Sequence, residues 1–122
     1  MQRTTDDDAQ AIKEAVIEGM QDKKGGHIVS LDFRAIPNAL CRFFVICHGT
    51  SRVQVEAIAE GVEAKVRNDA GARPWNREGF ENAEWILLDY VNVVVHIFQD
   101  KVRDFYRLEK LWADAESQEY SA

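Results

Sequence analysis

The sequence predicts an α/β fold in which a single-domain mixed β-sheet is flanked by helices. Segments with an apolar residue at every third or fourth position alternate along the chain with short runs of β-branched and aromatic residues. Hydrophobic residues make up 46% of the chain and charged residues 30%, an ordinary balance for a folded protein. The 122 residues are enough to bury a core of their own. We therefore expect one domain over residues 1–122, with its core at about 8–115.

The first expected helix runs from Thr5 to about Lys24. Thr5 is its expected N-cap, and the three aspartates that follow place negative charge at the positive end of the helix dipole. Gly25 and Gly26 are expected to end the helix. The apolar residues of one helical face are Ala9, Ile12, Val16 and Met20.

Two strands are expected next, at residues 27–33 and 42–48. The first, "HIVSLDF", alternates apolar and polar side chains, as a strand with two different faces does. The second, "RFFVICH", has five consecutive apolar residues, which indicates a central strand covered on both faces. Pro37 places a loop between them, because proline cannot donate to a strand ladder.

A second helix is expected after "GTSRVQ". Ser51 and Gln54 match the spacing of a capping box, in which two side chains satisfy free backbone N–H groups at the helix start. Gly71 is the expected C-terminal stop. The buried residues of this helix are expected to be Val55, Ile58, Val62 and Val66.

The rest of the chain is expected to form a loop with a short edge strand at 73–79, strands at 84–90 and 93–98, and a helix from Asp100 to Ala115. Residues 116–122 are polar, and we expect a loose tail there. The inner side of the last helix is expected to consist of Val102, Phe105, Leu108 and Trp112.

A two-residue turn at Val91 and Asn92 would fix which side chains share a face of the hairpin. One face would carry the pairs Trp85–Phe98, Leu87–His96 and Asp89–Val94. The other would carry Ile86–Ile97, Leu88–Val95 and Tyr90–Val93. The second set is almost entirely aliphatic and predicts the core side, whereas the first mixes aromatic, imidazole and carboxylate groups, as recognition surfaces do.

Two alternatives remain open for this hairpin. A helix could cover Trp85 and Phe98, which would make them core residues. A type I′ turn also requires positive φ at both central residues, which β-branched Val91 resists, so a longer loop could shift the register.

Charge and targeting signals limit the classes of partner. The net charge of −6, from 21 acidic and 15 basic residues, argues against a protein that binds mainly DNA or RNA and favours a basic protein partner. The best candidates for a local basic patch are Arg103, Arg107 and Lys110. The chain has neither a signal peptide nor an apolar run of the about 20 residues that span a bilayer, and its two cysteines make no disulfide framework. We expect a cytoplasmic protein that does not enter the membrane.

The sequence gives little support to catalysis. Ser51 follows a strand near His48, but "HGTSR" is not a nucleophile elbow, and Ser51 is better explained as a helix cap. Nucleotidyltransferases also have a strand followed by Gly and Ser at a helix start, yet they hold metal with paired carboxylates. Here Asp89 stands on its strand without a second acid two positions away. We expect no catalytic residue.

Metal binding has equally little support. Cys41, Cys47 and His48 form no C-x-x-C motif, and adjacent residues of a strand point to opposite faces. Cys47 is expected to be a buried reduced thiol and His27 to lie at the surface. His96 has a structural explanation too, a ring hydrogen-bonded to a neighbour such as Asp89 or to water. We expect neither a metal nor another cofactor.

Taken together, the motifs resemble the Iojap or RsfS family of ribosomal silencing factors. The matching stretches are "IVSLDF", "FFVICHGTSRVQVEAIAEGVE", "REG", "AEWILLDY" and "VVVHIFQDKVRDFYRLEKLW". They contain G-T-S-x-x-Q, W-x-x-x-D, V-H-x-F and R-x-F-Y-x-L-E-x-L-W in one order, over about residues 8–115. The sequence departs from many relatives at Val91-Asn92, where they have Gly-Asp or Gly-Asn.

The resemblance implies a protein of the bacterial cytosol that binds ribosomal protein L-fourteen on the large subunit. It implies that the bound protein blocks subunit joining and represses translation under nutrient limitation, that free copies form homodimers, and that the fold is nucleotidyltransferase-like without the catalytic carboxylates. The partner-binding residues it implies are Trp85, Asp89, Tyr90, His96 and Phe98. A large-subunit assembly factor that uses the same surface is an alternative, and a residual nucleotidyltransferase is a weaker one.

Overall fold

The structure is a computed structural model that describes residues 6–106 and 114–121. Within these residues the elements follow in the order α1 (Asp6–Asp22), β1 (Gly26–Asp32), β2 (Phe43–Gly49), α2 (Arg52–Ala70), β3 (Asn76–Glu78), β4 (Trp85–Asp89), β5 (Val93–Gln99), α3 (Asp100–Tyr106) and β6 (Glu116–Tyr120).

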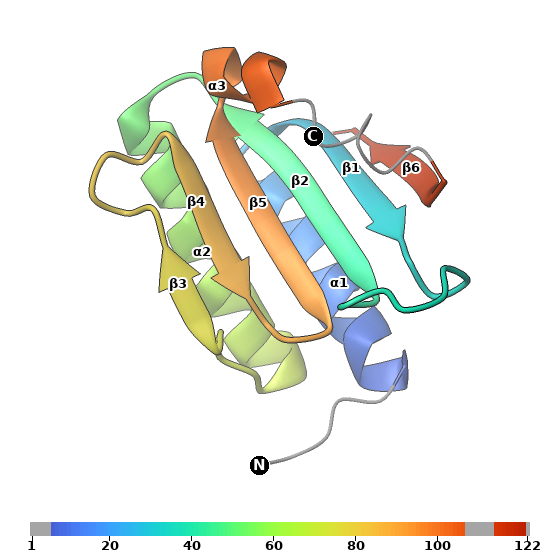
Figure 1. Cartoon of the computed structure of the whole chain (residues 1–122). Helices are drawn as coiled ribbons and strands as arrows, with labels where there is room; N and C mark the ends of the chain where they lie inside the picture. Colours follow the sequence, from blue (N-terminus) through green and yellow to red (C-terminus); the bar gives the residue numbers. More distant parts are fainter. Residues whose placement is uncertain (1–5, 107–113, 122) are drawn as a thin grey trace.

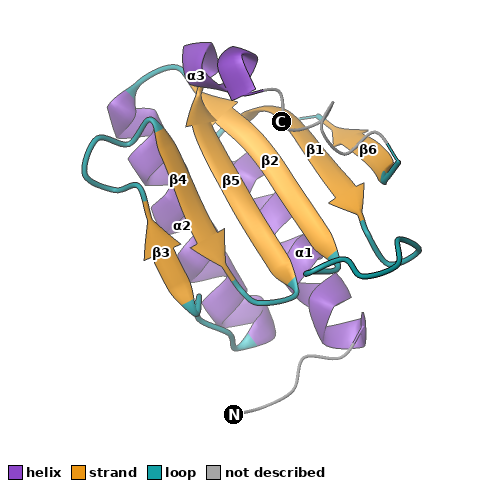
Figure 2. Ribbon diagram, in the orientation of Figure 1, coloured by secondary structure: helices purple, strands orange, loops and turns teal. Residues whose placement is uncertain are grey.

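The strands form a six-stranded sheet in the order β3-β4-β5-β2-β1-β6 (Figure 1). The two central strands, β2 and β5, pair in parallel, and each of the other neighbouring pairs is antiparallel. The predicted mixed sheet flanked by helices is therefore confirmed, and β2 is the central strand that its five apolar residues indicated. The colouring of Figure 2 shows the two long helices, α1 and α2, side by side behind the sheet.

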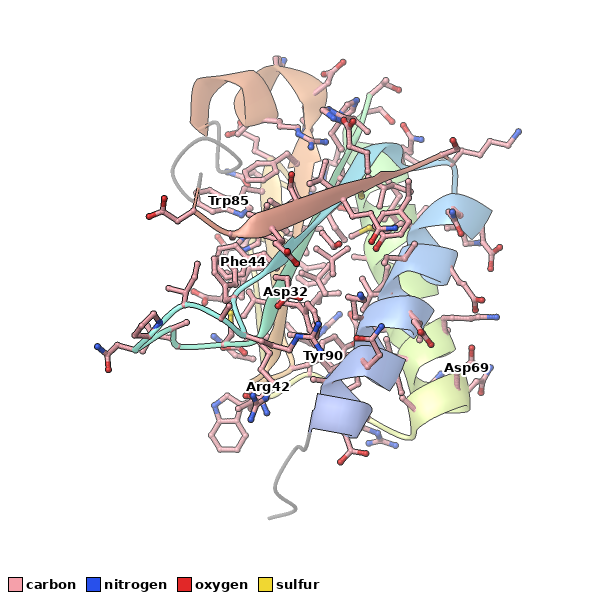
Figure 3. All side chains as sticks on the ribbon, turned by 90° about the vertical axis from the view of Figure 1, so that its right-hand side faces the viewer. Asp32, Arg42, Phe44, Asp69, Trp85 and Tyr90 are labelled. Carbon is pink, nitrogen blue, oxygen red and sulfur yellow. The ribbon has the colours of Figure 1, made fainter. Side chains whose placement is uncertain are left out.

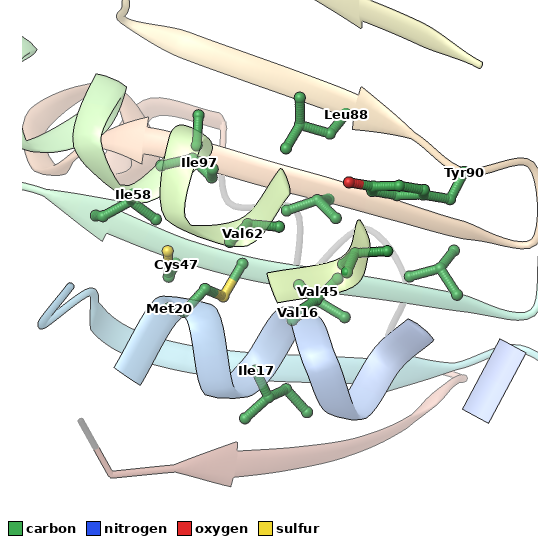
Figure 4. Packing of buried hydrophobic residues seen from close by; sticks show 14 of the residues in the cluster. Val16, Ile17, Met20, Val45, Cys47, Ile58, Val62, Leu88, Tyr90 and Ile97 are labelled. Atoms are coloured by element: carbon green, nitrogen blue, oxygen red, sulfur yellow. The ribbon is translucent and has the colours of Figure 1, made fainter. Parts of the chain in front are cut away.

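The sheet divides the core into two layers. Between the sheet and the helices α1 and α2, which cover what we call the helix face, lies the larger apolar cluster (Figure 4). Val16 and Met20 of α1, Val62 of α2, and Val45 and Cys47 of β2 meet there, each fully buried. Burying such side chains contributes about 1.5–3 kcal/mol each, so this layer is the main source of stability.

A smaller apolar cluster lies on the opposite side of the sheet, which we call the outer face. Its buried members are Val29, Leu31, Phe33, Ile46, Phe98 and Ala115. Phe44 and Trp85 pack against it while remaining partly exposed, and Val102 of α3 contacts it at the end of β5. The outer face is thus an apolar surface that the two long helices do not cover.

The ends of α2 agree with the sequence. The Ser51 hydroxyl accepts a hydrogen bond from the Gln54 backbone N–H at 3.1 Å, and Gly71 adopts the left-handed conformation with φ 63°. The returning bond of the capping box is displaced by one residue, because Oε1 of Gln54 accepts from the Thr50 N–H at 2.7 Å. Both predicted ends of this helix are confirmed.

The end of α1 differs from the prediction. The helix stops at Asp22, and Lys24 rather than a glycine takes positive φ. Gly25 and Gly26 are needed for another reason: a Cβ at Gly26 would lie 2.5 Å from Nε2 of His48, and one at Gly25 would lie 3.0 Å from Sγ of Cys47. The two glycines therefore allow close approach to β2. The expected cap Thr5 lies outside the described residues.

The expectation of a loose C-terminal tail is wrong. Residues Glu116–Tyr120 form β6, which pairs antiparallel with β1. The Tyr120 hydroxyl lies 3.1 Å from Oγ of Ser30, and its ring packs against the core. The strand escaped prediction because its other side chains are polar and exposed, as edge strands often are.

The final helix is described as far as Tyr106. Val102 faces the outer cluster as expected, whereas residues 107–113, with Leu108 and Trp112, and the Phe105 side chain lie outside the described residues. The expected helix end at Ala115 is wrong, because Asp114 and Ala115 form a turn that leads into β6.

Candidate functional site

The hairpin formed by β4 and β5 has the predicted register. Trp85 lies opposite Phe98, Leu87 opposite His96, and Asp89 opposite Val94. The Tyr90 N–H donates to the Val93 carbonyl at 2.8 Å, which closes a two-residue connection at Val91 and Asn92. The register, and with it the division of side chains between the two faces, is confirmed.

The turn itself is strained at Val91, which has φ 75° although it is β-branched. The Asn92 N–H donates to the Tyr90 carbonyl at 3.0 Å, so the turn is a tight γ-turn rather than type I′. Oδ1 of Asp89 accepts from the Val91 N–H at 2.7 Å, and two N–H groups at the start of β2 donate to the Asn92 carbonyl at 2.8 and 3.0 Å. These bonds offset a backbone strain of about 1–3 kcal/mol.

The outer face of strands β4, β5 and β2 is the candidate site. The parallel pairing of β2 with β5 aligns Phe44 with Val94 and Ile46 with His96. Because side chains alternate along each strand, β2 extends the face that the hairpin begins. The residues of the outer face on these three strands are Phe44, Ile46, His48, Trp85, Leu87, Asp89, Val94, His96 and Phe98.

Four rings form a continuous cluster at its centre. The ring centroids of Trp85 and Phe98 are 4.9 Å apart, those of Trp85 and His96 5.9 Å, and those of Phe44 and His96 4.6 Å. Such separations are typical of favourable aromatic pairs. Figure 3 shows Trp85 and Phe44 on the side of the sheet away from the two long helices.

A hydrogen bond fixes the tautomer of His96. Nε1 of Trp85 donates to Nδ1 of His96 at 3.1 Å, so the imidazole proton resides on Nε2. Burial lowers the pKa of His96 from 6.5 to about 4, which keeps the ring neutral. Nε2 is buried and makes no hydrogen bond to any residue that the structure describes. The expected neighbour that satisfies the His96 ring is therefore Trp85 rather than Asp89.

The exposure of these side chains is graded. Phe98 and His96 are buried, with exposed fractions of 1% and 5%. Trp85, Leu87 and Val94 are only half-buried. The alternative that Trp85 and Phe98 are core residues is therefore correct for Phe98, whereas part of the Trp85 ring remains accessible beside it.

Two other predicted residues lie elsewhere. Tyr90 is buried on the helix face, where desolvation raises the pKa of its hydroxyl, so it does not join the other four implied residues. It precedes the turn, and the alternation of the hairpin directs it to that side. Arg103 was a candidate surface cation but is 5% exposed and donates to the carbonyls of Gly26 and His27. Arg107 and Lys110 lie outside the described residues.

Cys47 and His27, which could have served as a nucleophile or a metal ligand, have structural surroundings instead. Cys47 is a free thiol buried on the helix face, and desolvation raises its pKa to about 12. His27 lies at the surface, as expected, with Nε2 2.6 Å from the Glu119 carboxylate. In residues 6–106 and 114–121, no three His, Cys, Asp or Glu side chains are placed to hold a metal ion.

Within the same residues, no helix is long and apolar enough to cross a membrane.

Five residues of the outer face were absent from the implied site: Phe44, Ile46, His48, Leu87 and Val94. Leu87 and Val94 could have been included, because the hairpin register already places them between the implied residues. Phe44 could not have been, because its place beside His96 depends on the parallel pairing of β2 with β5. Pairing between strands separated by a long connection leaves no local signal in the sequence.

Comparison with known proteins identifies the family. Residues 6–122 match the family model described as "RsfS: Ribosomal silencing factor during starvation". The chain is 41% identical over 106 residues to ribosomal silencing factor RsfS of Halalkalibacterium halodurans, covering 87% of this chain and 89% of the relative. The RsfS of Bacillus subtilis is 42% identical over 94 residues, with 77% and 78% covered.

The fold agrees with the sequence comparison. A crystal structure of a protein from Chromobacterium violaceum superimposes with a TM-score of 0.80 at 37% identity, covering 86% of each chain. The match in sequence extends over nearly the whole chain, and the resemblance drawn from the motifs is confirmed. The chain belongs to the RsfS family of ribosomal silencing factors.

Proposed function

We propose that this chain binds the large ribosomal subunit through ribosomal protein L-fourteen and sterically blocks subunit joining, so that translation falls when nutrients are limiting. The observation that carries the proposal is the outer face, an aromatic and aliphatic surface on a chain of a silencing-factor family. In this proposal the protein is a binding factor rather than an enzyme.

The outer face has the composition of a protein-binding surface. Trp85, Leu87, Val94 and Phe44 are half-buried and contiguous across three strands, and they surround the buried rings of His96 and Phe98. Interface centres are enriched in aromatic side chains, which bury a large area at a low cost in conformational entropy. A binding face built on paired strands is also rigid, so docking orders little further chain.

Charge favours a basic partner. The chain carries a net charge of −6, and Asp89 lies at the end of the outer face next to the turn. Complementary charge accelerates association and selects between partners more than it raises affinity. A basic ribosomal protein fits this surface better than bare RNA, because phosphate groups would be repelled by the net charge.

Steric exclusion requires no chemistry from the factor. A 13.9 kDa protein that occupies the surface where the small subunit approaches would prevent contact between the subunits. We therefore expect silencing without nucleotide and without any metal beyond what ribosomes themselves require. The family membership also supports two subsidiary proposals, a cytoplasmic location and a homodimer when the protein is off the ribosome.

Cosedimentation tests the proposal. Purified protein is mixed with isolated large subunits, with isolated small subunits, or with ribosomal protein L-fourteen alone, and bound protein is measured after centrifugation or by titration. We expect binding to the large subunit and to the isolated ribosomal protein, and none to the small subunit. Binding to large subunits that lack this ribosomal protein, at undiminished affinity, would refute the proposed contact.

A variant of the outer face makes the test specific. Leu87→Glu places a charge at the centre of the face, where the side chain is half-buried between Trp85 and Asp89. We expect large-subunit binding to be lost while the unfolding transition stays cooperative. Val53→Glu is the matched control, because Val53 is 76% exposed at the start of α2 on the helix side of the sheet.

A further inference from the structure

Leu40 is the most exposed large hydrophobic side chain in the described part of the structure. Its exposed fraction is 99%, compared with 76% for Val53, 72% for Trp75 and 46% for Val91. It lies in the loop that joins β1 to β2, residues 33–42, where Pro37 and Ala39 are also exposed. A single exposed leucine is ordinary, so its meaning depends on how the loop is held and what lies beside it.

The loop is tied down at its base. The Phe33 N–H donates to the Arg42 carbonyl at 2.8 Å, and the Arg42 N–H donates to the Asn92 carbonyl, also at 2.8 Å. The Arg34 guanidinium binds the Asp32 carboxylate at 2.8 Å and lowers the pKa of that carboxyl. The side chains of Ile36 and Cys41 on either side of Leu40 pack against the outer apolar cluster. Leu40 thus projects from a loop with a defined path.

The loop continues the outer face. Cys41 packs against the outer apolar cluster, and burial followed by the charge of Asp89 raises the pKa of its thiol to about 11. Phe33, at the first position of the loop, lies 4.8 Å from the Phe44 ring, measured between centroids. In Figure 3 the loop extends away from α1 and α2 on the side of Phe44 and Trp85, beyond the plane of the sheet.

We propose that this loop is the second arm of the docking surface, with Leu40 as an anchor that enters an apolar pocket of the protein bound to the outer face. The inference rests on the proposed function and names a contact that the hairpin residues do not provide. A leucine side chain that passes from full exposure to a buried pocket raises affinity by about tenfold or more. The occupant is the basic ribosomal protein, because the arm continues its proposed binding face at the end that carries Asp89.

The test compares two exposed aliphatic residues on opposite sides of the sheet. Affinity for isolated large subunits is measured for the wild type, Leu40→Ala, Leu40→Met and Val53→Ala, with urea unfolding of each variant. We expect Leu40→Ala to weaken binding about tenfold or more, and Leu40→Met and Val53→Ala to bind within about twofold of the wild type. Stability should be unchanged in Leu40→Ala, because its side chain contributes no buried area.

The outcomes distinguish the Leu40 anchor from the proposed binding to the large subunit. Wild-type affinity of a folded Leu40→Ala protein would overturn the anchor and leave the proposed function standing. Failure of the wild type to bind large subunits would refute the proposed function and the anchor with it. Weaker self-association of Leu40→Ala with unchanged large-subunit affinity would also overturn the anchor, because the occupant would then be a second copy of this chain.

Discussion

Exchanging Trp85 for phenylalanine removes the hydrogen bond to His96 and keeps an aromatic ring beside Phe98. In the wild type, Nδ1 of His96 accepts from Nε1 of Trp85 at 3.1 Å, and Nε2 has no partner among residues 6–106 and 114–121. After the exchange Nδ1 loses its donor, in a side chain that is only 5% exposed. A buried polar atom left without a partner costs about 1–3 kcal/mol. We expect Trp85→Phe to lower the free energy of unfolding by about 2 kcal/mol.

Trp85→Phe should lower the free energy of unfolding by less when His96 is also replaced. In His96→Phe the buried imidazole is gone, so Trp85→Phe leaves no unsatisfied ring nitrogen. We expect the double variant to be more stable than the sum of the single changes predicts, by at least about 1 kcal/mol. Urea unfolding of the four proteins at pH 7.5 measures this coupling energy. Equal costs of Trp85→Phe in the two backgrounds would refute the account of the outer face as a hydrogen-bonded cluster.

Three further predictions concern the turn, His96 and the buried thiol. Val91→Gly should raise the free energy of unfolding by about 1 kcal/mol, because φ 75° is strained for valine; a loss of stability in urea unfolding would contradict this. The pKa of His96 falls from 6.5 unfolded to about 4 folded, so stability should decline as pH drops through that window, by up to about 3 kcal/mol; His96→Phe, compared at pH 7.5 and 4.5, should lack this part of the decline. Cys47 should react with a thiol reagent at pH 8 only as the protein unfolds, whereas immediate reaction of both thiols would show that it is not buried.

Local patterns in the sequence predicted most of the fold. The ends of α2, the central place of β2 and the register of the hairpin follow from a capping serine, an apolar run and a two-residue turn. Each of these depends on residues close together in the chain. The sequence predicted strain at Val91. It did not predict the hydrogen bonds that offset this strain, because two N–H groups at the start of β2 donate them to the Asn92 carbonyl.

Features that depend on distant contacts were missed. Strand β6 has polar side chains and becomes a strand only because β1 offers a free edge. The buried position of Arg103 depends on the carbonyls of Gly26 and His27, which are far away in sequence. In the candidate site, the Trp85–His96 bond could have been inferred from the register, because the two residues are diagonal neighbours on one face.

We propose that binding of this protein by its outer face prevents subunit joining. Light scattering measures joining directly, because the joined ribosome scatters more than the separate subunits. Large subunits are incubated with the wild type, Leu87→Glu or Val53→Glu, small subunits are added, and the amplitude is recorded without added nucleotide. The account predicts a reduced amplitude with the wild type and Val53→Glu and a full amplitude with Leu87→Glu. Full joining with the wild type at saturating binding, or equal inhibition by a folded Leu87→Glu protein, would contradict it.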